Sequence, residues 1–414
     1  MGKINKIILF LYTFFVIYLP DFSVYFPFLP NTSILVFFLA TLNIVLLNKH
    51  ILWVIKKNEI YAIFIVLFIL IIQLTITNLD DFDLGNLWPL GLFIVQIINY
   101  LSLVIWFYKL YHPENVYSLL KYLVFIGMIQ FFIILFMQLQ PDLKNIAVTL
   151  YGGKEGVPER LRYLLSYRIY GIGSSYTFML PLIQTFFSVI ALYLYSEGKG
   201  FFYFITSVLL IYSSIVNGRT GMYIYIIIMI IYFLKQSLQK FNLKILIFSF
   251  GTLIIFVISV LFILNFYPDR FTWITEGIEE IILLFFAGET SQNTNVGRLI
   301  GEHLVFPKGF DIIFGLGKNI FSGITYRNNY IHSDIGYIND LFRGGIIYIF
   351  LLYPTILSFF NKYCTKPFLK TSLVLFFVIA NYKGEITGGT PIILLILLIP
   401  MLISYNDMYI SHNK

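Results

Sequence analysis

The chain has 414 residues, of which 59% are hydrophobic and 12% are charged, and its net charge is +7. A soluble domain is about 45–50% apolar and about 25% charged, so this composition excludes an ordinary soluble enzyme and predicts a polytopic membrane protein. The single cysteine, Cys364, excludes an intrachain disulfide and a cysteine-based metal site. The positive net charge points to membrane topology and an anionic ligand rather than to nucleic acid.

Twelve stretches of the chain are apolar enough to cross a bilayer, for which a helix needs about 20 mainly apolar residues. They cover residues 5–20, 32–48, 59–77, 88–108, 117–138, 176–195, 200–216, 220–234, 244–266, 341–360, 369–382 and 389–405. Each is predicted to be a helix, because an open strand would leave backbone groups unpaired in lipid. We therefore expect an all-α polytopic integral membrane protein in which residues 1–414 form a single membrane domain of about twelve transmembrane helices.

The short loops predict the orientation of these helices. With the N-terminus in the cytoplasm, the segments MGKINK, NKHILWVIKKNE, SEGKG and NKYCTKPFLK are cytoplasmic, and their only Lys or Arg residues are lysines. The opposite side then carries the acidic loop NLDDFDLGN and two longer external loops, residues 139–175 and 267–340. This distribution follows the positive-inside rule and places both termini in the cytoplasm.

Arginine is distributed differently from lysine. In this orientation all eight arginines fall on the outer side: Arg160, Arg162, Arg168, Arg219, Arg270, Arg298, Arg327 and Arg343. The planar guanidinium fork binds phosphate or carboxylate through two parallel hydrogen bonds, which lysine does not. This favours an anionic ligand on the outer face; the alternative is that arginine is merely tolerated in long translocated loops.

The first long external loop, residues 139–175, interleaves basic and aromatic side chains. The set comprises Arg160, Arg162, Arg168, Tyr163, Tyr167 and Tyr170. Arginines bind anions and aromatic faces stack on sugar rings, so the loop suits a sugar-phosphate ligand. The alternative is an amphipathic helix that lies in the membrane interface.

A second arginine position is the hairpin NGRTG, residues 217–221, between two apolar spans. Arg219 is held tight against the membrane surface there, at the depth of a lipid-anchored diphosphate. The alternative is an arginine that extends its head group to the interface.

The long external loop, residues 267–340, exceeds the length of about 12–15 residues above which ordered loops are usually functional. Within it, NTNVGRLIGEHLVF is predicted to be a helix that carries Arg298, Glu302 and His303. FDIIFGLGKN is predicted to be a short apolar segment followed by a glycine turn.

The stretch YIHSDIGYINDLFRGG leads from this loop into the tenth span. A neutral His332 imidazole is suited to act as a base towards a sugar hydroxyl, with Asp334 orienting it. The alternative is a helix start capped by Ser333 and Asp334, with Arg343 extending outward, but capping does not account for His332.

One further cation lies in NYKGEITGG, between the last two spans on the same face. Lys383 either adds positive charge to the site or simply pairs with Glu385.

These motifs together resemble a known family. YRIYGIGSSYTFMLP, NGRTGMY, NTNVGRLIGE, DIIFGLGKN, YIHSDIGYINDLFRGGIIYIF and NYKGE are similar in order and membrane placement to motifs of bacterial O-antigen and capsular repeat-unit polymerases and the related O-antigen ligases. The resemblance covers roughly residues 160–390. Where the ligases often have Asn after the histidine region, this chain has HSD, which favours a polymerase.

The resemblance implies a C-type glycosyltransferase fold in the bacterial cytoplasmic (inner) membrane. The substrates would be oligosaccharides on undecaprenyl diphosphate, and membrane lipid, a chain-length regulator and a flippase would be partners. Arg219 and Arg298 match the arginines that hold the donor diphosphate, and His332 matches the histidine near the acceptor hydroxyl. We expect the outer-loop residues Arg160, Arg162, Arg168, Tyr170, Arg327, Asp334 and Lys383 to contact substrate.

No external Asp or Glu cluster has divalent-metal spacing, so we expect neither a metal nor another cofactor. Two other readings stay open: an O-antigen ligase, which differs only in its acceptor, and a flippase for lipid-linked oligosaccharides. A transporter places charges in the middle of its spans, whereas the span centres here are almost free of charge. The product, lipopolysaccharide O-antigen or capsule, is not specified by these residues.

Overall fold

The computed structural model describes residues 2–26, 28–57, 60–77, 84–140, 142–144, 168, 171–173, 178–239, 302–321 and 323–412. The predicted span 244–266 and most of the external loop 139–175 lie outside these residues, as does the loop 267–340 up to residue 301.

Each predicted span that falls on described residues coincides with a helix. The long helices are α1 (Gly2–Tyr18), α2 (Thr32–Lys57), α3 (Ile60–Thr77), α4 (Leu84–Tyr111), α5 (Tyr117–Leu139), α8 (Met179–Ser196), α9 (Phe202–Ile215), α10 (Arg219–Gln239), α15 (Gly336–Tyr363), α16 (Pro367–Lys383) and α17 (Pro391–His412). Within the described ranges, α2, α3, α4, α5, α8, α15 and α17 are long and apolar enough to cross a membrane. The protein is therefore an all-α polytopic membrane protein, and the count of twelve crossings stays a prediction.

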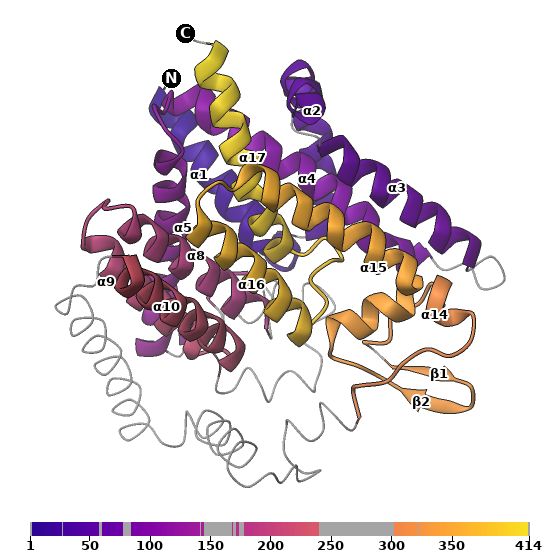
Figure 1. Ribbon diagram of the computed structural model, residues 1–414. Coiled ribbons are helices and arrows are strands. Elements are labelled where there is room, and N and C mark those ends of the chain that lie inside the picture. Colours follow the sequence, from indigo (N-terminus) through magenta and orange to yellow (C-terminus); the bar gives the residue numbers. More distant parts are fainter. Residues whose placement is uncertain are drawn as a thin grey trace, which may run out of the picture.

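Two helices form the centre of the bundle, because they are apolar on every side. Every residue of α8 from Met179 to Leu194 is buried, and so is the stretch of α17 from Ile392 to Ile399. Figure 1 shows α17 passing through the bundle beside α4, with α15 and α16 on its other side. In contrast, α2 and α3 expose large apolar side chains such as Phe38 and Phe68, as expected of helices that face lipid.

Small hydroxyl side chains join α8, α9 and α10. Ser188 and Ser207 each donate to the other's backbone carbonyl, at 2.7 and 2.8 Å, and Ser207 also bonds the Tyr225 hydroxyl at 2.8 Å. The Thr185 and Ser214 hydroxyls lie 2.8 Å apart nearer the other end of the same interface. Small polar residues of this kind let helix backbones approach closely in a membrane.

The helices alternate in direction, as their order in the sequence predicts. At one end, the Lys6 ammonium lies 4.7 Å above the Tyr111 ring. At the same end, Lys366 pairs with Glu197 at 3.1 Å. This lysine-rich end therefore gathers the starts of α1 and α16 and the ends of α4 and α8.

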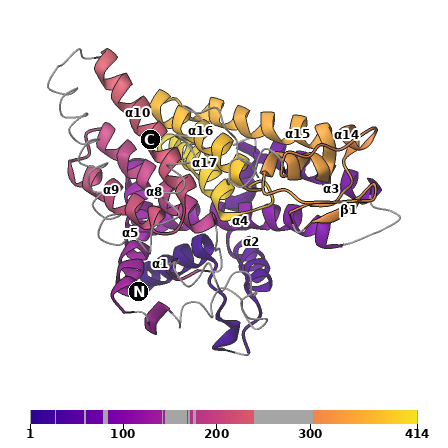
Figure 2. The same cartoon turned by 90° about the horizontal axis from the view of Figure 1, so that it is seen from below.

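The opposite end carries a two-stranded hairpin, β1 (Ile324–Tyr326) and β2 (Asn329–Ile331), paired antiparallel. Figures 1 and 2 both place this hairpin far from the two chain termini. We call it the hairpin end. Which end faces the cytoplasm stays a prediction.

Helix α15 is broken near its start. Gly345 has φ 65° and ψ −162°, a conformation essentially restricted to glycine, and it separates a short first arm from the long second arm. The break frees carbonyl groups, which are bonded from elsewhere: Leu316 N–H donates to the Phe342 carbonyl at 2.6 Å, and the Gln73 amide of α3 donates to the Gly344 carbonyl at 2.7 Å. The predicted span 341–360 thus contains the break, and the helix begins five residues earlier.

Of the two elements predicted in the segment before α15, one is confirmed and one is wrong in part. The short apolar segment is confirmed as α14 (Asp311–Phe314), followed by Gly315 with φ 73°. The helix predicted over NTNVGRLIGEHLVF is wrong for its last residues, because Glu302–Phe306 has no helical structure; residues 293–301 lie outside the described residues.

Replacing Gly345 with Ala is expected to lower the stability of the folded protein by about 1–3 kcal/mol, because the new methyl group would meet the Ile313 carbonyl and the backbone would be strained. The measurement is the midpoint of thermal unfolding in detergent micelles. The matched control is Gly91→Ala in α4, where nothing lies within 4 Å of the added carbon, so equal losses in the two variants would contradict this account of the break.

Candidate functional site

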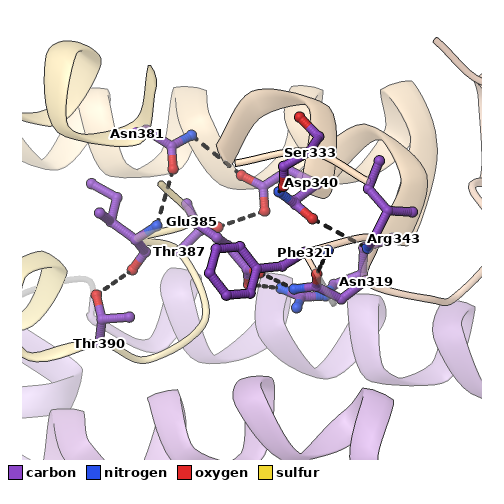
Figure 3. A network of polar contacts seen from close by, with 12 residues as sticks. Asn319, Phe321, Ser333, Asp340, Arg343, Asn381, Glu385, Thr387 and Thr390 are labelled. Atoms are coloured by element: carbon purple, nitrogen blue, oxygen red, sulfur yellow. Dashed lines mark hydrogen bonds and ion pairs between the residues drawn. The ribbon is translucent and has the colours of Figure 1, made fainter. Parts of the chain in front are cut away.

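A cluster of buried charges lies where the first arm of α15 meets the link between α16 and α17 (Figure 3). Arg343, only 1% exposed, forms an ion pair with Glu385, and the Asn319 amide donates to the same carboxylate. Asp340 lies one helical turn before Arg343 and is fully buried. We call these residues and the hydrogen-bonding partners of Asp340 the buried ion network.

Asp340 accepts hydrogen bonds on both carboxylate oxygens. Thr387 donates to one oxygen at 2.6 Å, and Tyr353 donates to the other at 2.5 Å. The Asn381 amide lies 3.3 Å from the second oxygen and 2.5 Å from the Tyr353 hydroxyl. A buried carboxylate is costly unless its oxygens are hydrogen-bonded, and these contacts supply those hydrogen bonds.

The sequence builds this network from one helical spacing and two glycines. Asp340 and Arg343 are three residues apart, which places them on one helix face. Gly336 has no side chain, so the first arm packs directly against the Asn381 carbonyl. Gly384 likewise accommodates the Phe178 ring at the start of α8. The close approach brings Glu385 to Arg343.

One alternative from the sequence is corrected by this geometry. Arg343 does not extend outward to the interface, since its side chain is buried against Glu385. Glu385 pairs with Arg343 and accepts from the Asn319 amide, and the two readings of Lys383 stay predictions.

A pair of histidines lies beside the network, in the segment that leads to α15. The rings of His303 and His332 have centroids 4.5 Å apart at an interplanar angle of 69°. The backbone N–H of Asp334 donates to His303 Nδ1 at 3.1 Å, and the Ser333 hydroxyl donates to the His303 carbonyl at 2.7 Å. We call His303 and His332 the histidine pair.

The capping alternative for Ser333 and Asp334 is wrong. Helix α15 has Ile335 at its N-cap and no capping hydrogen bond from a side chain. Ser333 instead holds the loop, accepting from the Ile335 N–H at 3.1 Å while it donates to His303. The two residues therefore order the loop around His303 rather than begin the helix.

His303 of this pair favours its neutral form, because its pKa is lowered. Burial is the main reason that the pKa of His303 is lowered, and nearby His332 and Lys383 lower it further. Asp334 and Glu302 act in the opposite direction but do not reverse the shift. Since a backbone N–H can only donate, Nδ1 of His303 carries no proton and the neutral ring carries it on Nε2. A neutral imidazole is the form that acts as a general base.

The structure brings some predicted site residues together. His332, Asp334 and Lys383 all lie around His303, on which each has an electrostatic effect. Arg327 lies apart from them on the hairpin turn, exposed, where it donates to the Lys308 carbonyl at 3.1 Å and lies 3.8 Å from Asp311.

Arg219 is the first residue of α10, and its side chain lies outside the described residues. The backbone around it is placed by Gly218, which packs against Pro181 of α8. Phe178, three residues before Pro181, packs on Gly384. The start of α10 and the α16–α17 link therefore both flank the start of α8, at the hairpin end.

Of the remaining predicted site residues, the structure describes Arg168 alone. Arg168 is half-buried, three residues before Gly171, which packs at Gln130 of α5. Arg160, Arg162, Tyr170 and Arg298 lie outside the described residues.

Sequence reasoning missed His303, Asp340 and Asn319 as site residues. The i, i+3 spacing of Asp340 and Arg343 beside GG was a usable signal, because two opposite charges on one face at the start of an apolar span need an explanation. No local pattern points to His303, whose contacts come from residues about 30 positions later.

No protein-family model matches the chain, and no curated protein is significantly similar to it. Within the part of the chain that the structure describes, no group of three or more His, Cys, Asp or Glu side chains forms a candidate metal site. Metal independence stays a prediction.

Replacing Arg343 with Met is expected to lower stability by about 3–5 kcal/mol, because it leaves the Glu385 carboxylate buried without its cation. The double variant Arg343→Met/Glu385→Leu removes both charges and is expected to recover most of that loss. Thermal unfolding of the purified variants measures both effects. A double variant as unstable as Arg343→Met would show that the ion pair is not what holds this region.

The pH dependence of stability tests the protonation state of His303. Its pKa in the folded protein is lowered from an unfolded value of about 6.5, so its contribution to stability is present above about pH 6.5 and is lost as the pH falls through the lowered pKa. His303→Asn keeps an acceptor for the Asp334 N–H and is expected to flatten this acid loss between about pH 7 and 5. His112→Asn, at the lysine-rich end, is the control and should keep the wild-type profile.

Proposed function

We propose that this protein is a membrane glycosyltransferase that polymerises oligosaccharide repeat units carried on undecaprenyl diphosphate. It would work at the outer face of the bacterial cytoplasmic membrane and transfer the growing glycan to the non-reducing end of a new unit. The observation that carries the proposal is the histidine pair at the hairpin end, where burial favours the neutral form of His303 and where α10 also begins with Arg219.

The reaction needs a base on one side of the sugar and cations on the other. A hydroxyl oxygen of the acceptor unit attacks the anomeric carbon of the donor, and the bond from that carbon to the lipid diphosphate breaks. The hydroxyl proton passes to His332, and the diphosphate leaves with the bonding electron pair. Arg219 and Arg298 would stabilise its charge through paired hydrogen bonds.

The described surroundings of His332 suit this role. The ring centroids of His303 and His332 are 4.5 Å apart, and burial lowers the pKa of His303, which favours an uncharged neighbour beside the proposed base. Asp334 is held by its backbone contact to His303, which keeps its carboxylate next to the pair. Lys383 adds positive charge that suits an anionic substrate.

The buried ion network would act as the floor of this site. Arg343 pairs with Glu385, Asp340 accepts from Thr387, and Asn319 ties the network to the loop that carries the histidine pair. Ser333 N–H donates to the Ile320 carbonyl at 3.3 Å. Because Ile320 follows Asn319 and Ser333 follows His332, this bond links the network to the histidine pair. A rigid support of this kind holds a base in position for catalysis.

A flippase is the second candidate, and one observation favours it. Uncharged polar side chains gather near the middle of α1, α2 and α4: the Asn43 amide donates to the Tyr12 hydroxyl at 2.8 Å and to the Asn99 side chain at 3.2 Å. Gln96 Nε2 is buried nearby without a partner. Polar groups at that depth are typical of transport paths, although charged ones are the stronger sign.

The first experiment compares surface glycan and lipid-linked intermediates in a strain with and without this protein. Without it, we expect single repeat units at the outer surface and no ladder of longer chains. Long chains accumulating on undecaprenyl diphosphate would instead identify a ligase, and units trapped at the cytoplasmic leaflet would identify a flippase. An unchanged profile would refute all three.

Complementation with variants tests the assigned roles. Arg219→Ala, Arg298→Ala and His332→Ala are each expected to reduce polymer at least 100-fold while the protein remains inserted, as for loss of one stabilising or proton-transferring group. Arg219→Lys keeps the charge but not the two-pronged geometry and should restore only part of the activity. Lys199→Ala, at the lysine-rich end, is the matched control. Normal chain length in both arginine-to-alanine variants would refute the diphosphate contact.

A further inference from the structure

A cleft of about 600 Å³ opens at the lysine-rich end, between the starts of α1 and α5 and the end of α4. It lies at the opposite end of the bundle from the histidine pair, so the proposed glycosyl transfer does not use it. One part of its lining is polar and the other part is aromatic. Together the two parts determine which class of ligand the cleft can bind.

The polar part carries positive charge. Lys6 of α1 and Lys121 of α5 both line the cleft, together with the Ser118 hydroxyl. No Asp or Glu belongs to the lining among the described residues. Lys6 lies over the Tyr111 ring, with its ammonium 4.7 Å from the ring centroid, which holds one cation at the cleft. Two ammonium groups without a carboxylate favour an anion and disfavour a choline headgroup, which carries a cation of its own.

The aromatic part is a continuous wall. Phe107 stacks on Tyr111 at 4.8 Å and contacts Tyr122 at 5.2 Å. Phe10 and Phe125 lie 6.3 Å apart on α1 and α5, and the Phe125 side chain is 55% exposed. These rings belong to helices that enter the membrane, so the wall continues the surface of the bundle towards hydrocarbon. An acyl chain can pack against these rings, whereas a soluble phosphate has no apolar part that would contact them.

We propose that this cleft binds an anionic phospholipid of the leaflet at the lysine-rich end. The lipid phosphate contacts Lys6 and Lys121, and its glycerol or headgroup lies by Ser118. An acyl chain packs along Phe10, Phe107 and Phe125. The bound lipid thereby joins α1, α4 and α5 at their ends. This proposal is independent of the proposed polymerase activity.

The test is native mass spectrometry of the intact protein released from detergent, titrated with phosphatidylglycerol or with phosphatidylcholine of the same acyl chains. Wild-type protein is expected to bind at least one phosphatidylglycerol more tightly than phosphatidylcholine. Lys6→Gln/Lys121→Gln should weaken that binding about 30-fold, since each lysine near an anionic lipid contributes on the order of a tenfold factor or less.

The matched control is Lys3→Gln/Lys109→Gln, which removes the same charge from exposed positions on α1 and α4 that do not line the cleft. It should keep the wild-type preference. Ser118→Phe fills the cleft without changing its charge and should also abolish tight binding, so the proposal stays testable if the double lysine variant does not fold.

Three outcomes would overturn the proposal. Equal weakening in the cleft and control variants would mean general attraction of lipid to a basic surface. Equal binding of the two lipids by wild-type protein would remove the role of charge. Displacement of the lipid by glycerol 3-phosphate at equal concentration would show a soluble phosphate site in which the aromatic wall has no part.

Discussion

The ion pair between Arg343 and Glu385 forms beside a break in a membrane helix, and the hairpin end is organised around that break. Gly345 interrupts α15 and exposes carbonyl groups that hydrocarbon cannot satisfy. Their donors come from Leu316 and from Gln73, so the break joins the preceding loop to α3 within the bundle. The charges follow from the same geometry, because the short first arm turns Arg343 inward to where Glu385 can neutralise it.

The two ends of the bundle consequently differ in where their charged side chains lie. At the hairpin end, Arg343 is paired with Glu385 inside the bundle, and the half-buried His303 favours its neutral form. At the lysine-rich end, cations line a partly aromatic cleft. The central helices α8 and α17 connect the ends and are fully packed, so the positions at which α10 and α15 begin are set by rigid neighbours.

The sequence predicted the helices well and the site only in part, for identifiable reasons. Long apolar runs force a helix in lipid, so every span on described residues could be located without knowing its neighbours. The partner of Arg343 is 42 residues away, and no periodicity connects the two. The HSD triplet looked like a helix start because its residue types favour caps, yet a tertiary bond to His303 recruits Ser333 instead. His303 itself lay in a segment with a helical pattern, and non-local hydrogen bonds overrode that local preference.

The proposed transfer favours an arrangement in which the buried ion network is separate from the histidine pair that reacts. A reaction on a lipid-tethered sugar must occur near the membrane edge, where an uncompensated charge would be costly and a base would lose its proton affinity if cations crowded it. Here Arg343 and Glu385 form an ion pair, and Asp340 accepts hydrogen bonds on both of its carboxylate oxygens. They hold the loop in place without presenting free charge to the substrate. The His303 ring beside them favours its neutral form, because burial lowers its pKa, and it therefore adds no fixed cation next to His332, the proposed base.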